Sequence, residues 1–305
     1  MTGRVLRSTG SWYSVLAEDG TLRSCRVRGK LRLEDSRESN PVAVGDRVRL
    51  ELDEGDATIT EVLERTNHIV RQSARKAGHS HVIAANVDQA LLLATIAHPR
   101  TSTGFIDRFL VTCEAYGIPQ VLVINKRDLL SEEDLELAHA ILDLYAGLGV
   151  TTLLVSLKAD ETISGLERQL TGKTTLITGH SGTGKSTLLN RIMPDARQQV
   201  GAISAFSEKG VHTTTFAEMF RIGEDTFVID TPGIKEWGLL DMTPQEISDY
   251  FPEMRERRLS CRFGSRCIHL HEPGCAVLQA VEEGTISGSR YHNYLSMISG
   301  EDNRK

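Results

Sequence analysis

The segment Gly179-His-Ser-Gly-Thr-Gly-Lys-Ser186 constrains the fold more than any other part of this chain, because it matches the eight-residue P-loop pattern. It follows a strand-like run at 175–178 and precedes a helical run at 187–193, and a P-loop requires both flanks. Its glycines let backbone N–H groups curl around phosphates at the start of a helix, where Lys185 adds a cation and Ser186 a hydroxyl for Mg²⁺. The pattern predicts a phosphate site in an α/β domain, for ATP or for GTP. The residues that we expect at the nucleotide are Gly179, His180, Ser181, Gly182, Thr183, Gly184, Lys185, Ser186 and Thr187.

A guanine-binding pattern, Asn125-Lys126-Arg127-Asp128, directly follows the strand-like run 121–124. It therefore lies at the carboxyl end of a strand, where open α/β sheets bind ligands. The Asp128 carboxylate can accept hydrogen bonds from the ring N–H and exocyclic amine of guanine, and adenine lacks both. This pattern favours GTP over ATP, although Asn-Lys followed by Asp is also a common helix-capping turn.

A second base element is predicted at Val155-Ser156-Leu157-Lys158, which resembles the Ser-Ala-Lys element of GTPases. Leu157 departs from the usual alanine. Because the contact with guanine is made largely by backbone N–H groups, Ser156 stays a candidate, and an ordinary strand end is the alternative.

Two switch segments are expected around the γ-phosphate. Asp230-Thr-Pro-Gly233 follows the strand-like run 226–229, which suits an Asp that organises Mg²⁺ hydration and a Gly whose N–H senses the phosphate. One residue of the run Thr213, Thr214 and Thr215 is expected to complete the metal shell, and a threonine-rich strand is the alternative.

Many GTPases orient the attacking water with a glutamine just beyond the Asp-x-x-Gly motif. This chain has Ile234 at that position, so another residue must orient the water. His212 is the best replacement, since an imidazole can orient water or accept its proton near neutral pH. A structural or partner-contacting histidine is the alternative. The expected catalytic residues are thus His212 and Lys185.

The order of these motifs is unusual. GTPases commonly present the P-loop first, then the switches and then the guanine motifs, whereas here the guanine motifs at 125–128 and 156 come before the P-loop. The domain is therefore predicted to be circularly permuted, which is physically reasonable when the original ends lie close together on the surface.

A metal site is predicted near the carboxyl end, where three of the five cysteines lie close together. Cys261, Cys267, His269 and Cys275 offer three thiolates and one imidazole for a closed tetrahedral structural Zn²⁺ site, one per chain. His271 is an alternative ligand, and buried thiols in a helical module are the alternative to a metal.

The chain is predicted to have three domains and a linker. Residues 1–65 contain about five short strand patterns, which suit an OB-fold or, less well, an SH3-like barrel. Residues 66–85 have no clear periodicity and indicate a polar linker. Residues 86–240 alternate strands and helices, as expected of the α/β GTPase domain, and residues 241–305 are predicted to form a mostly helical zinc-binding domain.

Charge and hydropathy limit the partners. The net charge of −6 argues against nucleic-acid binding by the whole surface, so RNA contacts must be local. The longest apolar run is too short to span a membrane, no signal peptide is evident, and we expect a cytoplasmic protein with no membrane partner, by default a monomer. Two local basic stretches are candidates for RNA: Arg23, Arg26, Arg28, Lys30 and Arg32 near Trp12 and Tyr13, and Arg255, Arg257, Arg258, Arg262 and Arg266.

Together these motifs resemble the ribosome small-subunit-dependent GTPase A family, whose members combine an OB-fold, a permuted GTPase and a zinc module in this order. The resemblance spans nearly the whole chain, although the family usually has four residues, and not five, between its first two zinc cysteines. Its motifs are Asn86-Val-Asp-Gln89, Asn125 to Asp128, Gly179 to Thr187, His212 to Thr215, Asp230 to Gly233, Glu272-Pro-Gly-Cys-Ala-Val277 and Arg290-Tyr291.

The resemblance implies a GTPase that is stimulated by the small ribosomal subunit, acts late in its maturation and binds ribosomal RNA. It would bind GTP and GDP with Mg²⁺. A competing hypothesis is a nucleotide-gated RNA-binding module, in which GTP occupancy and not turnover controls docking. A P-loop ATPase or kinase is a third, which the guanine pattern argues against.

Overall fold

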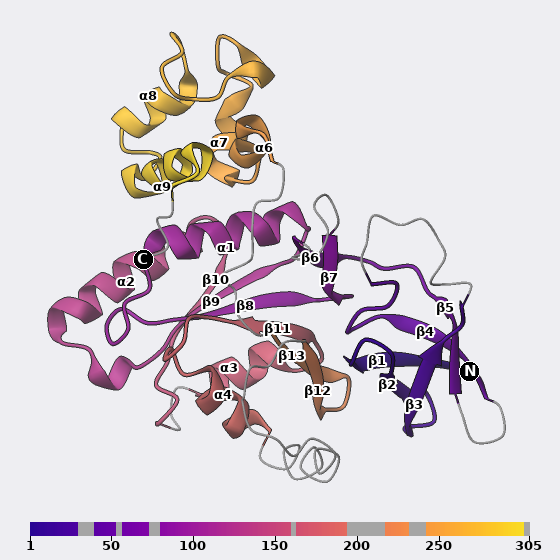
Figure 1. The fold of residues 1–305 in the computed structure, drawn as a ribbon. Coiled ribbons are helices and arrows are strands. Elements are labelled where there is room, and N and C mark those ends of the chain that lie inside the picture. Colours follow the sequence, from indigo (N-terminus) through magenta and orange to yellow (C-terminus); the bar gives the residue numbers. More distant parts are fainter. Residues whose placement is uncertain are drawn as a thin grey trace.

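The computed structural model describes residues 1–29, 40–52, 57–72, 80–159, 163–193, 217–231 and 242–301. Three parts are visible in Figure 1: a small β-barrel at the amino end, a central sheet with helices on both faces, and a helical carboxyl-terminal part that lies over one of those helices. This is the predicted fold class, an all-β barrel, an α/β P-loop domain and a helical module in that order.

The barrel consists of β1 (Thr2–Ser8), β2 (Tyr13–Ala17), β3 (Leu22–Val27), β4 (Arg47–Leu52) and β5 (Ala57–Val62). The strands pair in the order β1-β2-β3-β5-β4, and β4 returns to β1, so the ring closes. β3 and β5 run parallel and the other neighbours antiparallel. The closed five-stranded ring with this crossover is the OB arrangement, which settles the choice between OB and SH3-like barrels.

The central sheet is parallel except at one edge. Its strands are β8 (Gln89–Ala94), β9 (Gln120–Ile124), β10 (Thr151–Leu154), β11 (Thr174–Thr178), β12 (Glu218–Gly223) and β13 (Thr226–Asp230), in the order β10-β9-β8-β11-β13-β12. Only β12 is antiparallel to its neighbour in this sheet. Because both faces are covered, the strands read as continuous apolar runs, and all six residues of β8 are buried.

Two hydrophobic layers hold helices on opposite faces of this sheet (Figure 1). α1 (Thr103–Ala115) and α2 (Glu132–Ala146) pack on one face, where Leu92 lies. α3 (Ile163–Leu170) and α4 (Lys185–Ile192) pack on the other, with Leu91 and Leu93. Side chains alternate along a strand, so neighbouring leucines of β8 reach different layers.

Within residues 66–85, which the sequence predicted to be a polar linker, the described residues form two strands. β6 (His68–Gln72) and β7 (Ser80–Ala85) pair antiparallel as a separate two-stranded sheet. The sequence pattern failed here because each strand is short and neither alternates cleanly: β6 ends in Arg71 and Gln72, whereas β7 begins with Ser80 and His81 and continues with four apolar residues.

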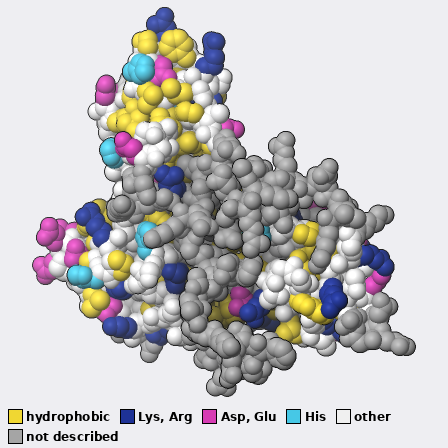
Figure 2. Space-filling view, in the orientation of Figure 1, with side chains coloured by type: hydrophobic (Ala, Val, Ile, Leu, Met, Phe, Trp, Pro, Cys, Tyr) yellow, Lys and Arg dark blue, Asp and Glu magenta, His cyan; other side chains and the backbone are white. Residues whose placement is uncertain are grey.

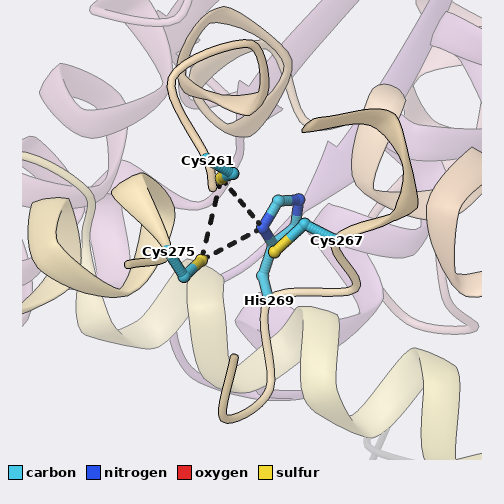
Figure 3. A group of neighbouring side chains, drawn as sticks. All are labelled: Cys261, Cys267, His269 and Cys275. Atoms are coloured by element: carbon cyan, nitrogen blue, oxygen red, sulfur yellow. Dashed lines mark hydrogen bonds between the residues drawn. The ribbon is translucent and has the colours of Figure 1, made fainter. Parts of the chain in front are cut away.

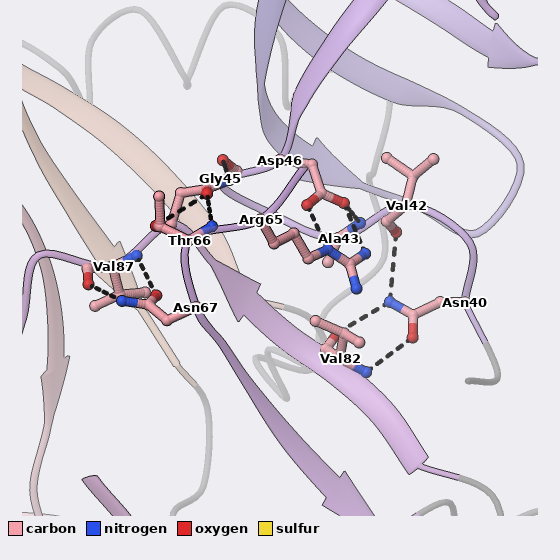
Figure 4. A network of polar contacts seen from close by, with 11 residues as sticks. Asn40, Val42, Ala43, Gly45, Asp46, Arg65, Thr66, Asn67, Val82 and Val87 are labelled. Atoms are coloured by element: carbon pink, nitrogen blue, oxygen red, sulfur yellow. Dashed lines mark hydrogen bonds and ion pairs between the residues drawn. The ribbon is translucent and has the colours of Figure 1, made fainter. Parts of the chain in front are cut away.

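Side-chain amides tie this hairpin to the barrel and to the central domain (Figure 4). Asn40 both accepts from and donates to the backbone of Val82, at 2.9 Å in each case. Asn67 makes the same reciprocal pair with Val87, at 2.8 Å. Such paired bonds mimic a strand ladder, so the segment forms a structured joint between the barrel and the α/β domain.

Gly45 lies at the tightest point of this joint. Its φ is +91°, and a Cβ there would lie 2.1 Å from the carbonyl oxygen of Ala85. We therefore expect Gly45→Ala to lower the free energy of unfolding by about 2–3 kcal/mol, measured by chemical denaturation. Gly20→Ala is the matched control, because Gly20 also has a positive φ (+78°) but faces open space. Equal losses in the two variants would contradict the steric argument.

The carboxyl-terminal part contains α6 (Pro244–Asp249), α7 (Pro252–Arg258), α8 (Ala276–Glu282) and α9 (Gly288–Ser299). α6 begins with a capping box between Thr243 and Glu246. Among the described residues, no helix is both long and apolar enough to cross a membrane.

The contact between α9 and α1 contains a buried ionic network. Asp107 on α1 accepts hydrogen bonds from Arg290 (2.6 Å), Asn293 (2.6 Å) and Tyr145 (2.7 Å). Arg290 also makes a two-bond pair with Glu253 of α7, at 2.7 and 3.0 Å. Asp107 and Arg290 are 0% and 2% exposed, so this network fixes the helical part on the α/β domain.

Candidate functional site

A cavity of about 440 Å³ lies between the P-loop and the loops that follow β9 and β10. Those loops leave the carboxyl ends of parallel strands, where open α/β sheets bind ligands. The size is typical of a small-molecule site. It is lined by Asn125, Lys126, Asp128, Leu129, Leu157, Lys158, Ser181, Gly182, Gly184, Lys185, Ser186 and Thr187.

The P-loop runs from β11 into α4 with three glycines in conformations that other residues avoid. Gly179, Gly182 and Gly184 have φ values of +152°, +84° and +108°. A Cβ on Gly179 would lie 2.3 Å from the carbonyl oxygen of Leu93, so the loop can follow this path only with glycine there. The path turns the loop N–H groups and the start of α4 toward the cavity, a ready-made anion site.

Lys185 is the cation of this site. Its Nζ donates to the carbonyl oxygens of Gly179 (2.5 Å) and His180 (2.8 Å) within the loop. Burial lowers its pKa, while Asp230 opposes that shift. The ammonium group is thus held beside the loop N–H groups and near a carboxylate, as a site for phosphate with a divalent cation requires.

The base end of the cavity is arranged by hydrogen bonds among the predicted guanine residues. Ser156 donates its hydroxyl to Asp128 at 2.6 Å, which fixes the direction of that carboxylate. Asn125 accepts from the N–H of Leu157 (3.1 Å) and donates to the carbonyl oxygen of Thr183 in the P-loop (2.8 Å). The structure therefore brings the two guanine elements and the P-loop together around one cavity.

Lys126 covers one side of the cavity. It adopts a left-handed conformation (φ +67°), and its Nζ donates to the carbonyl oxygen of His98 in the loop after β8. Its aliphatic stem is free to lie over a base plane. Arg127 is exposed and begins a short 3₁₀ turn (Arg127–Leu129), and it does not line the cavity.

Three P-loop residues that were predicted to lie at the nucleotide, Gly179, His180 and Thr183, do not line the cavity. Thr183 is fully buried and donates its hydroxyl to the carbonyl oxygen of His180 (2.9 Å), so it shapes the loop. The His180 ring packs against Phe105 of α1, with 3.8 Å between ring centroids and 36° between the ring planes. These side chains support the loop, while Gly179 contributes backbone geometry.

Asp230 ends β13 beside the P-loop strand, in register with Ile177. On its other side it pairs with Glu218, the first residue of β12. Asp230 therefore lies at a strand end beside the P-loop, which is the position expected of an aspartate that organises Mg²⁺. The remaining predicted switch residues, His212, Thr213, Thr214, Thr215 and Gly233, lie outside the described residues.

The predicted metal ligands form one buried cluster (Figure 3). The ligand atoms of Cys261, Cys267, His269 and Cys275 all lie within 4.8 Å of one another. The sulfurs of Cys261 and Cys275 are 3.9 Å apart, and Nδ1 of His269 lies 3.7 and 3.3 Å from them. Tetrahedral Zn²⁺ with Zn–S bonds of about 2.3 Å places two sulfurs about 3.8 Å apart. The donor set and spacing therefore fit a closed zinc site.

Burial shifts the ionisation of the side chains in the cluster. Burial raises the pKa of Cys267 to about 12 and raises that of Cys275, whereas it lowers the pKa of His269. Neutral imidazole is the form that binds metal, and a bound cation displaces the thiol protons. His271, the alternative ligand, is exposed and outside the cluster.

Hydrogen bonds from neighbouring residues hold the loop that contains His269, one of the ligands of the cluster. The Glu272 carboxylate accepts from the backbone N–H groups of Ile268, Leu270 and His271, at 2.8, 2.8 and 3.1 Å. From α9, the Tyr291 hydroxyl donates to the carbonyl oxygen of His269 at 2.7 Å. Through this hydrogen bond, α9, which also carries Arg290, is joined to the loop that contains the metal ligand His269.

The side chains of the two basic stretches differ in their exposure and in their contacts. On the barrel, Arg26 lies over the Trp12 ring at 4.1 Å, but Tyr13 is only 4% exposed and offers no surface on which a base could stack. Lys30 and Arg32 lie outside the described residues.

In the helical part, Arg255 and Arg258 are engaged by Glu114 and Asp249. Arg257, Arg262 and Arg266 are exposed. Figure 2 shows Lys or Arg side chains beside hydrophobic ones at the outer end of this part.

Sequence patterns missed several parts of the site. β12, which places Glu218 opposite Asp230, was not expected, and neither was the joint around Gly45. The buried Arg290–Asp107 pair had one available signal: Arg290 lies on the same helical face as Tyr294 and Met297, a face that should be apolar.

Comparison with known proteins was consistent with this geometry. The family described as RsgA GTPase matches residues 62–240, and the family described as RsgA N-terminal domain matches residues 2–59. A protein of Bacteroides thetaiotaomicron named small ribosomal subunit biogenesis GTPase RsgA 2 is 47% identical over 306 residues, covering 100% of this chain and 98% of the relative. The protein named small ribosomal subunit biogenesis GTPase RsgA from Christiangramia forsetii is 46% identical and covers 99% and 97%.

Two solved structures have the same arrangement over the full chain. YjeQ from Thermotoga maritima superposes with a TM-score of 0.80 at 35% identity, covering 100% of this chain and 99% of that one. YloQ, described as a circularly permuted GTPase, superposes with a TM-score of 0.76 at 31% identity, covering 100% and 96%. The permuted order inferred from the motifs is therefore an order found in a solved fold.

Proposed function

The chain belongs to the RsgA GTPase family, and from this premise we propose that its cavity binds GTP with Mg²⁺ and hydrolyses it to GDP and phosphate during maturation of the small ribosomal subunit. The observation that carries the proposal is the shared cavity, in which Asp128, fixed by Ser156, faces the same space as Lys185. One end recognises guanine and the other neutralises phosphate.

Each residue has a defined task in this reaction. Asp128 accepts hydrogen bonds from guanine, and Lys185 with the loop N–H groups stabilises charge that develops on the phosphate oxygens. Ser186 and Asp230 would hold Mg²⁺, which supplies further charge neutralisation, together with one of Thr213 to Thr215. Gly233 would sense the γ-phosphate.

The partners follow from the names of the relatives and from the charge distribution. We propose that the small subunit is the activator and that its RNA meets the exposed arginines of the helical part and the Arg26–Trp12 pair of the barrel. We further propose a monomer that acts in the cytoplasm, with zinc as the structural metal at Cys261, Cys267, His269 and Cys275.

The test is hydrolysis of GTP and of ATP by the purified protein, with small subunits, with large subunits and alone. We expect GTP turnover to rise with small subunits only. If neither subunit raises turnover, the ribosomal role fails and the nucleotide-gated binding module becomes the better proposal.

His212→Ala separates turnover from occupancy. If His212 orients the attacking water, we expect this variant to lose about 10²- to 10⁴-fold of the subunit-stimulated rate while its GTP affinity stays within twofold, as measured by fluorescent-nucleotide titration. His139→Ala, an exposed histidine of α2, is the control. A His212→Ala variant with normal stimulated turnover would place the water-orienting role elsewhere.

A further inference from the structure

The loop that follows β10 is attached directly to the P-loop helix. Arg191, near the end of α4, donates from Nη1 to the carbonyl oxygen of Leu157 at 2.9 Å. Leu157 lies between Ser156 and Lys158 in the predicted base element. The same residue donates its N–H to Asn125, so both backbone groups of Leu157 are held.

The side chain of Leu157 provides a third attachment. It is 4% exposed and belongs to the hydrophobic layer that contains Leu188 and Leu189 of α4. A Cβ on Gly184, the first residue before α4, would lie 3.4 Å from Cδ1 of Leu157. The leucine that replaces the usual alanine is thus packed against the start of the phosphate-binding helix, and the loop is set by α4 as much as by β10.

The position of this loop matters for the choice of base. Guanine presents the acceptor O6 at the place where adenine presents an amino group, which is a donor. Loop N–H groups that approach this edge attract guanine and repel adenine. Discrimination therefore depends on where the loop lies, in addition to the direction of the Asp128 carboxylate.

We propose that Arg191 is a positioning residue for guanine specificity: by holding the carbonyl of Leu157 on the P-loop helix, it fixes the base loop at the distance that guanine O6 requires. This inference rests on the proposed GTP-binding function of the same cavity. It adds that selectivity is controlled from the phosphate side of the site. Arg191 touches neither phosphate nor base in this role, since it acts through the backbone of Leu157.

The test is competitive binding of GDP and ADP to the full-length zinc-loaded protein, with displacement of a fluorescent GDP analogue as the readout. We expect Arg191→Met to weaken GDP about tenfold and ADP less than twofold, so that the GDP-to-ADP preference falls. Arg191→Lys keeps a donor and should recover part of that preference. Arg168→Met is the matched control, because Arg168 is an exposed arginine of α3.

The outcomes separate this inference from the proposed function. If the unaltered protein does not prefer GDP over ADP, the GTP-binding function itself fails. If it does, and Arg191→Met weakens both nucleotides equally or neither, the positioning role is overturned. Should Arg191→Met not fold, as judged by thermal unfolding without nucleotide, Arg191→Ala takes its place, because alanine also removes the donor and favours a helix. The same criterion applies: equal weakening of GDP and ADP, or of neither, overturns the proposal.

Discussion

Arg290→Met is expected to lower the free energy of unfolding by about 3–5 kcal/mol, because it leaves the carboxylate of Asp107 buried without its cation. Asp107 is fully buried, and Glu253 would lose its two-bond partner in the same variant. Burial by itself lowers the pKa of Arg290, but Asp107 and Glu253 together raise it above its usual value, so the guanidinium is charged. Replacing Arg290 removes the positive charge that compensates the carboxylates of Asp107 and Glu253.

Chemical denaturation followed by circular dichroism measures this effect. Arg257→Met is the control, because Arg257 is an exposed arginine of α7, and its replacement should change stability by no more than about 0.5 kcal/mol. The double variant Arg290→Met with Asp107→Asn should recover part of the loss, since it removes the uncompensated charge. A loss under 1 kcal/mol for Arg290→Met would show that the network is not the main attachment of the helical part.

This network also shows the limit of sequence patterns. The P-loop, the guanine motif and the cysteine cluster could be predicted because each is a local sequence pattern with a fixed chemical requirement. The strands of the barrel and of β8, β9 and β11 were predictable for a similar reason, since their apolar periodicity is strong.

Long-range polar contacts carry no such local signal. Asp107 and Arg290 are far apart in sequence, and although the position of Arg290 on an apolar helical face marks it as unusual, no local pattern identifies Asp107 as its partner. The hairpin of β6 and β7 contributes Ile69 and Ala84 to the hydrophobic core, but it is also attached by the side chains of Asn40 and Asn67 and by the close approach at Gly45, which no local pattern reveals. Arg191 was missed because its partner is a backbone carbonyl, which any residue could supply.

Loss of the metal is expected to have the largest effect on stability. Cys275→Ser should reduce bound zinc from one ion per chain to a small fraction and lower the melting temperature by about 10 °C or more, since metal binding at a structural site is folding free energy. The remaining thiols and His269 would stay buried without a cation to organise them. The loop from Ile268 to His271 would then depend on Glu272 and the α9 tyrosines alone.

Metal content by elemental analysis and calorimetric melting test this directly, and His271→Ala is the control. His271 is exposed and outside the cluster, so that variant should keep its zinc and its melting temperature. Full zinc in Cys275→Ser, or equal loss in both variants, would contradict the assigned ligand set. Because α9 holds the His269 loop through Tyr291 and grips α1 through Arg290, zinc loss should also weaken the attachment to α1. Combining Cys275→Ser with Arg290→Met should therefore cost less than the sum of the two single losses.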